Sequence, residues 1–78
     1  MITYEQRVSK IKTIEDIDDQ LRKAKAYARR LRSAAVACPT LADKLAMNEK
    51  VKEAERVLRR LRMNSFDIED SLKLQGAA

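Results

Sequence analysis

The chain of 78 residues contains no histidine and only one cysteine and one glycine, and these absences bear on catalysis. Histidine is the commonest general base at neutral pH, and Cys38 has no histidine to activate it as a nucleophile. Gly76, as the only glycine, cannot build the glycine-rich loop that cradles phosphates. We therefore expect a protein that is not an enzyme, binds no cofactor and takes no small-molecule substrate.

The acidic stretch EDIDD, residues 15–19, is the one segment whose composition suggests a divalent metal. It lacks the ligand spacing and the turn glycine of a calcium-binding loop. Carboxylates are favoured in the first turn of a helix, where they complement the helix dipole. We expect a solvated acidic cluster at a helix start and no metal site.

Long apolar runs are also missing. The longest is Ala34 to Cys38, whereas a membrane span needs roughly 20 apolar residues. The first ten residues, MITYEQRVSK, carry no apolar signal core. A single cysteine excludes a disulfide within the monomer, and an unpaired thiol suits a reducing compartment. These features predict a cytoplasmic protein with no membrane contact.

The only proline, Pro39, lies near the midpoint of the chain and separates two segments with the same apolar spacing. Steps of three and four residues are typical of helices that pack lengthwise on one another. Before the proline this seam comprises Ile14, Ile17, Leu21, Ala24, Ala28, Leu31, Ala35 and Cys38; after it, Met47, Val51, Ala54, Val57, Leu58 and Leu61. Because a residue before proline avoids the α conformation, the first helix should end near Cys38.

The resulting prediction is an all-α single domain over residues 1–78, built on an antiparallel two-helix hairpin. The long helices are expected over 14–37 and 41–63, with a turn over 38–40. Thr13 and Thr40 are placed to cap them. A short helix is expected over 3–12, and a second one over 65–73, capped by Asn64 or Ser65. Such a hairpin also suits dimerisation into a four-helix bundle.

Charges support the antiparallel arrangement and suggest a register. If the chain folds back about residues 38 and 39, the acidic stretch 15–19 lies beside Arg59, Arg60 and Arg62. Arg22 and Lys25 then lie beside Glu55 and Glu53. Exposed ion pairs contribute only ~0.2–1 kcal/mol each, so they are expected to influence register more than stability.

Positive charge is concentrated in the second half of the first long helix. Residues 22–37 hold six basic side chains and no acidic one, in a chain of net charge +5. One interpretation is a phosphate-binding face, with nucleic-acid contacts from Arg22, Lys25, Arg29, Arg30 and Arg32. The other is a solvated face whose cations complement the negative end of the helix dipole. The sequence leaves both interpretations open.

Several apolar residues lie off the main seam and need cover. Leu41 and Leu45 are at the turn end of the second long helix, and Tyr27 flanks the seam of the first. A hairpin has a single inner face, so these side chains either pack at the core edge or contact another molecule. We interpret Tyr27, Leu41 and Leu45 as partner-binding residues, with another protein or a second copy of the chain as the partner.

The segment RVLRRLRMNSFDIEDSL, residues 56–72, joins an arginine-rich helix to Phe66, Asp67, Glu69 and Asp70. Over residues 39–72 it resembles the helical hairpin of bacterial Swi/Snf-like helicases. The chain has none of the ATP-binding motifs of that family. The resemblance therefore implies an accessory or borrowed helical element and not a motor.

Taken together, the sequence predicts a helical protein-binding module that acts as an adaptor, regulator, inhibitor or co-chaperone through helix–helix packing. The alternative is a small nucleic-acid-binding protein that uses its basic helix face on DNA or RNA. Binding that weakens steeply with salt would favour the alternative.

Overall fold

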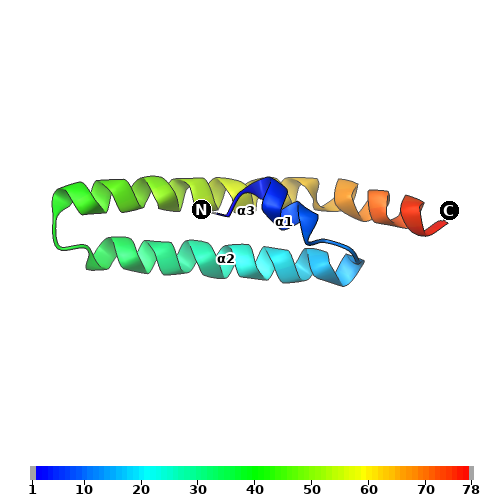
Figure 1. The fold of residues 1–78 in the computed structure, drawn as a ribbon, viewed down its shortest axis with the longest axis horizontal. Helices are drawn as coiled ribbons and strands as arrows, with labels where there is room; N and C mark the ends of the chain where they lie inside the picture. The colour runs from blue at the N-terminus through cyan, green and yellow to red at the C-terminus, as the bar shows by residue number, and fades with distance from the viewer. Residues whose placement is uncertain (1, 78) are drawn as a thin grey trace.

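The protein is a narrow helical hairpin, and its structure, a computed structural model, describes residues 2–77. Its helices are α1 (Tyr4–Ser9), α2 (Ile14–Ala37) and α3 (Leu41–Ala77). In Figure 1, α2 and α3 lie side by side and antiparallel, and the Cα positions extend over 55 × 16 × 15 Å. The all-α class and the two-helix hairpin are confirmed. None of the described helices combines the length and the apolar character that a membrane crossing requires.

Side-chain caps fix where α1 and α2 begin. Thr3 Oγ1 accepts a hydrogen bond from the backbone N–H of Gln6, and the Gln6 side chain accepts one from the backbone N–H of Thr3. Thr13 and Asp16 form the same reciprocal arrangement at the start of α2. Such capping boxes satisfy N–H groups that the first helical turn leaves without partners. The Thr13 cap is confirmed, and the predicted helix over 3–12 is shorter than expected.

Residues 38–40 form the turn that the proline predicted. Cys38 has an extended backbone, with φ −63° and ψ 132°, as expected for a residue that precedes proline. Its Sγ atom donates a hydrogen bond to the carbonyl oxygen of Ala34, 3.2 Å away. Thr40 Oγ1 then accepts a hydrogen bond from the backbone N–H of Asp43, which caps α3. The residues that end α2 and the residue that begins α3 thus lie within three consecutive positions, 38–40.

The core lies between α2 and α3 along the predicted seam. Alanine supplies much of it from α2, because Ala24 and Ala28 are almost completely buried. The buried apolar residues are Ile11, Ile17, Ala24, Ala28, Ala35, Val51, Ala54, Val57, Leu58 and Leu61. Of the seam predicted before the proline, Leu21, Leu31 and Cys38 are half-buried. Ile14, at the first position of α2, is the one exposed member, with 43% of its surface accessible.

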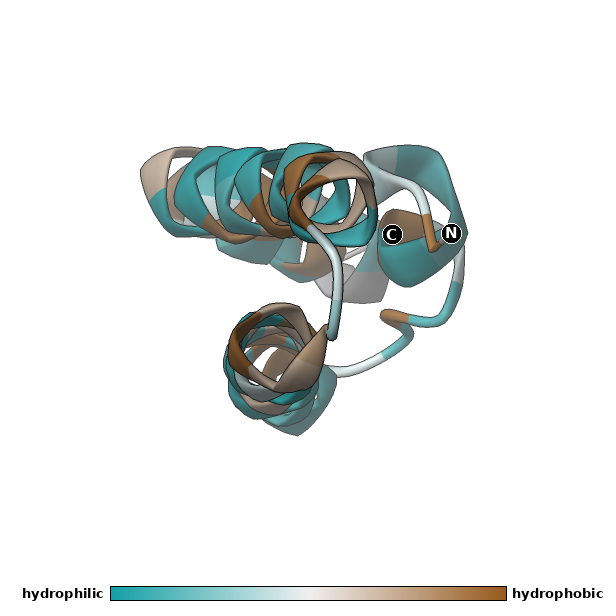
Figure 2. Ribbon diagram, turned by 90° about the vertical axis from the view of Figure 1, so that its left-hand side faces the viewer, coloured by the Kyte–Doolittle hydropathy of each residue, from teal (hydrophilic) through white to brown (hydrophobic). Residues whose placement is uncertain are grey.

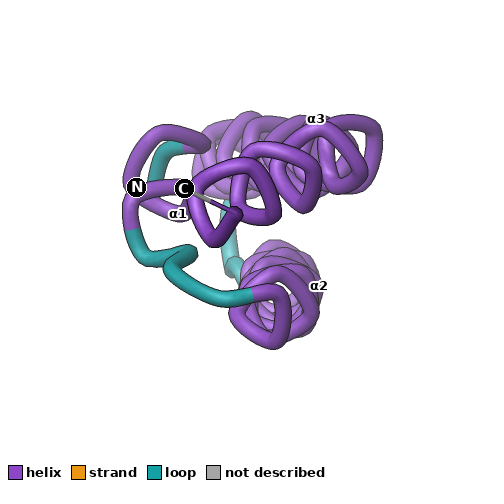
Figure 3. Tube along the Cα trace, turned by 90° about the vertical axis from the view of Figure 1, so that its right-hand side faces the viewer, coloured by secondary structure: helices purple, strands orange, loops and turns teal. Residues whose placement is uncertain are grey.

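The short helix α1 completes the core from one side. Tyr4 and Val8 pack against the buried cluster, and Ile11, in the loop after α1, belongs to it. The two end-on views show α2 and α3 as two rods with α1 beside them, on one side of the hairpin (Figures 2 and 3). The hairpin therefore has one flank covered by α1 and one open flank.

The separate C-terminal helix predicted over 65–73 is wrong, because α3 runs unbroken from Leu41 to Ala77. Ser65 Oγ donates to the carbonyl oxygen of Arg62, a bond made inside a helix, and Asn64 turns its side chain toward α1. No proline or glycine lies between Leu41 and Gln75, so nothing interrupts the helix. α3 consequently extends past the start of α2 (Figure 1), where Ile68 and Leu72 pack against the core.

The charge-based register was also wrong. Glu55 pairs with Arg32 at 2.8 Å, and Arg32 lies ten residues after Arg22, the neighbour that the charges predicted for Glu55. Arg22 instead pairs with Asp19, three residues before it in the same helix, and Arg60 pairs with Glu5 of α1. Exposed ion pairs contribute too little free energy to set the register, so packing of the apolar seam sets it.

Leu61 and Leu41 offer a matched test of where the core lies. Leu61 is fully buried, whereas Leu41 is 74% exposed. We expect Leu61→Ala to lower the free energy of unfolding by about 2–5 kcal/mol, because it removes buried methyl groups and leaves a cavity. Leu41→Ala should stay within about 0.5 kcal/mol of the parent. Urea denaturation followed by circular dichroism measures both, and equal losses would contradict the assigned core.

The unbroken α3 makes a second prediction. Thr13→Ala should lower the free energy of unfolding by about 1 kcal/mol, because Thr13 is a helix cap. Ser65→Ala should leave it unchanged or raise it by up to ~0.5 kcal/mol, because alanine is the better residue inside a helix. The same denaturation measurement compares the two variants. A loss at Ser65 as large as the loss at Thr13 would mean that a helix starts there.

Candidate functional site

Two of the three predicted partner-binding residues are open to solvent, and the third is not. Leu41 is 74% and Leu45 59% exposed, and the terminal segments do not cover them. Tyr27 is half-buried, and two guanidinium groups, those of Arg7 and Arg30, each lie 5.8 Å from the centroid of its ring. The structure therefore keeps Leu41 and Leu45 together and places Tyr27 apart from them, on the flank that α1 covers.

The exposed leucines belong to a longer apolar pattern along α3. Met63 lies eighteen residues after Leu45, which is about five turns of an α-helix, so the two share one face. Phe66 and Leu74 follow on the same face, three and eleven residues after Met63. We call this face, opposite the buried Ala54 and Leu61, the outer face of α3. Its large apolar side chains are all exposed: Leu41, Leu45, Met63, Phe66 and Leu74.

The middle of the outer face is basic. Lys52, Arg56 and Arg59 lie between the two apolar ends at helical spacing. Lys52 and Arg56 pair with Glu49 and Glu53 in the preceding turn, whereas Arg59 has no ion pair among the described residues. Surface pairs of this kind are weak and exchange readily with another partner. Along α3, the outer face is therefore apolar at both ends and basic in the middle.

Four of the five predicted nucleic-acid-binding residues share one side of the hairpin. Arg22, Lys25, Arg29 and Arg32 follow steps of three and four residues, so they project from the same side of α2. Arg59 and Arg62 of α3 line a shallow depression together with Arg32 and Glu55. We call this open side the basic flank. Its carboxylates are fewer than its cations: Glu55 pairs with Arg32, Asp19 pairs with Arg22, and Asp18 precedes Arg22 by four residues on the same side of α2.

Arg30, the fifth predicted residue, lies on the other flank. Its position one residue after Arg29 turns it about 100° around the helix. There its guanidinium lies over Tyr27, which Arg7 of α1 also contacts. The single basic face expected from the sequence is therefore two faces, one open and one beside α1. A count of charges along the chain does not separate them.

Arg7 is the residue that sequence reasoning missed most clearly. It is 4% exposed, and its Nη1 atom donates a hydrogen bond to Oε1 of the buried Gln20, 3.2 Å away. Burial lowers the pKa of the Arg7 guanidinium from its ordinary value; Tyr27 opposes that change, and the charge of Arg30 adds to it. No spacing rule marks Arg7, because it lies in a helix of six residues.

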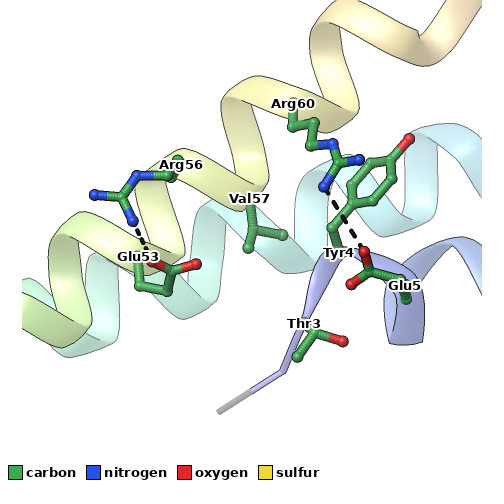
Figure 4. Close-up of a pocket in the computed structure, with 7 residues that line it drawn as sticks. All are labelled: Thr3, Tyr4, Glu5, Glu53, Arg56, Val57 and Arg60. Atoms are coloured by element: carbon green, nitrogen blue, oxygen red, sulfur yellow. Dashed lines mark hydrogen bonds and ion pairs between the residues drawn. The ribbon is translucent and has the colours of Figure 1, made fainter.

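A second contact fastens α1 to α3. The Arg60 guanidinium lies over the Tyr4 ring with its Cζ atom 4.0 Å from the centroid, a cation–π distance. Figure 4 shows the same guanidinium reaching Glu5, 3.7 Å away, and Arg56 paired with Glu53 nearby. Asn64 Nδ2 donates to the Tyr4 hydroxyl at 3.1 Å. These contacts hold α1 in place, and they explain why Asn64 is not a helix cap.

The acidic stretch 15–19 serves the start of α2. Hydrogen bonds from the backbone N–H groups of Lys12 and Thr13 lower the pKa of Asp16. The side chain of Lys23 does the same for Asp19, which it approaches to 3.0 Å. Within the described residues, no group of three or more acidic, cysteine or histidine side chains is placed to hold a metal ion. Asp16 therefore acts in capping, and Asp19 acts in ion pairing.

No protein-family model, curated protein or solved structure matches this chain. The resemblance of residues 39–72 to the hairpin of Swi/Snf-like helicases stays a prediction.

Proposed function

We propose that the protein is a non-enzymatic helical binding module that acts as an adaptor, regulator, inhibitor or co-chaperone. The supporting observation is the outer face of α3, where five large apolar side chains are exposed to solvent. A monomer gains no stability from such residues, whereas a partner that covers them removes apolar surface from water. Two ends of one continuous helix carry them, which suits a partner that is also helical.

Charge indicates what kind of helix fits. The basic middle of the outer face, Lys52, Arg56 and Arg59, calls for acidic residues at the centre of the partner and apolar residues at both ends. A second copy packed through the same face would bring those cations against their own equivalents, which disfavours a dimer formed in this way. We therefore take the partner to be an amphipathic helix of another protein.

Affinity capture from the source cells with variants of the outer face tests this function. Leu45→Glu and Phe66→Glu should each abolish capture of a protein that the parent retains, because a charge then replaces a buried apolar contact. Ile14→Glu, at an exposed position of α2, is the matched control and should capture the protein as the parent does. Capture should also survive nuclease treatment.

Two outcomes would contradict the proposal. One is that both outer-face variants capture the same proteins as the parent. The other is a stable dimer in light scattering that Leu45→Glu and Phe66→Glu convert to a monomer, since a second copy would then occupy the face.

The basic flank favours a second candidate function, nucleic-acid binding in the cytoplasm. Its cations lie on neighbouring helices and its carboxylates are fewer than its cations, which suits a phosphate backbone. Arg29→Gln should weaken binding to any duplex and reduce the salt slope by about 1. Arg30→Gln removes the same charge from the other flank and should leave the slope unchanged. Fluorescence anisotropy at several salt concentrations measures both, and equal effects would remove the basic flank as the site.

A further inference from the structure

A pocket on the flank beside α1 gathers positive charge from two parts of the chain. It forms where α1 and the loop after it lie along α2, and Ile2 and Ala26 supply the apolar part of its wall. Its cationic side chains are Arg7, Lys10, Lys23 and Arg30. No carboxylate is among the described residues that line it. Four like charges around one hollow repel one another unless an anion lies between them.

Arg7 is the deepest of these cations and has no acidic partner. Arg7 is 4% exposed, and the atom that accepts its hydrogen bond in the pocket wall is the neutral Oε1 of Gln20. A guanidinium carries five N–H donors, and the hydrogen bond to Gln20 uses only one of them. Burial of a charge is costly unless an opposite charge compensates it. The aromatic ring of Tyr27, 5.8 Å away, compensates it only in part.

The other cations are also largely uncompensated. Arg30 shares the Tyr27 ring with Arg7, and neither Arg30 nor Lys10 has an ion pair among the residues that the structure describes. Lys23 is the exception, since Asp19 lies 3.0 Å from its Nζ atom. Three cations without an ion pair among the described residues therefore line one pocket, and one of them, Arg7, is buried and bonded to Gln20.

We propose that this pocket binds a phosphate group, either as free phosphate or as a phosphate monoester. Arginine pairs with phosphate through two parallel hydrogen bonds, and a multiply charged anion relieves the mutual repulsion of several cations at once. The Arg7 guanidinium would donate two parallel hydrogen bonds to the phosphate, and Arg30 and Lys10 would contact its other oxygens. Ile2 and Ala26 would contact the organic part of an ester. The site lies on a flank of the hairpin and does not depend on the function proposed for α3.

Titration with inorganic phosphate and with phenyl phosphate at constant ionic strength tests this proposal. Calorimetry measures the affinity, and two-dimensional NMR follows the arginine Nε–H groups. We expect saturable binding by at least one of the two ligands, with the Arg7 Nε–H resonance among those that shift most. Tighter binding of phenyl phosphate would identify an ester as the ligand, and equal or tighter binding of inorganic phosphate would identify the free anion.

Exposed residues serve for the variants, because Arg7 also holds α1 in place. Arg30→Gln and Lys10→Gln should each weaken binding about tenfold, as expected for the loss of one charge-assisted hydrogen bond. Arg22→Gln and Lys25→Gln remove the same charge from the basic flank and should change the affinity less than twofold. Arg7→Lys keeps the positive charge but loses the two parallel N–H donors, so it should weaken phosphate binding. Circular dichroism of this variant should show the same helicity as the parent.

The proposal fails if neither phosphate compound gives a saturable change. It also fails if the basic-flank variants weaken binding as much as Arg30→Gln and Lys10→Gln do, because the effect would then come from net charge alone. Binding that persists in full when both Arg30 and Lys10 are replaced would likewise place the ligand elsewhere.

Discussion

The close approach of α2 and α3 along a seam of small residues is the constraint on which the rest of the structure depends. Ala24, Ala28 and Ala35 face α3 with almost no side chain to hold the helices apart. Val57, Leu58 and Leu61 of α3 fill the remaining space from the other side. The interface is therefore narrow, and a helix of 37 residues has more apolar side chains than it can bury there. The outer face of α3 carries the remainder.

The same narrow seam determines where the charges go. Alanine occupies much of the seam on the α2 side. The long lysine and arginine side chains of α2 therefore lie on the two flanks of the hairpin and not between the helices. On one flank they stay open to solvent. On the other flank they lie beside α1, where the guanidinium groups of Arg7 and Arg30 are each 5.8 Å from the centroid of the Tyr27 ring. The uneven charge of the sequence thus becomes two surfaces of different character, separated by the body of α2.

Much of the fold could be predicted because the relevant signals are local. Thr13, Pro39 and the three–four apolar spacing each act within a few residues, and each was confirmed. The continuity of α3 was missed because Asn64 and Ser65 are good cap residues elsewhere, whereas here Asn64 bonds to Tyr4 of α1. That bond spans sixty residues, and no local rule contains it. The buried Arg7 was missed for the same reason, since its partner Gln20 lies in another helix.

The continuity of α3 has a consequence for the candidate surfaces as well. Had the helix broken at Ser65, Leu41 and Leu45 would have formed a small patch at the turn, unrelated to Phe66. One unbroken helix aligns them, because Phe66 follows Leu45 by twenty-one residues, which is close to six turns. The outer face then points away from α2, while the basic flank and the flank beside α1 lie on either side of the hairpin. A helix docked on the outer face would leave the flank beside α1 open, so protein binding and phosphate binding there need not compete. The basic flank differs, because Arg59 belongs both to it and to the outer face.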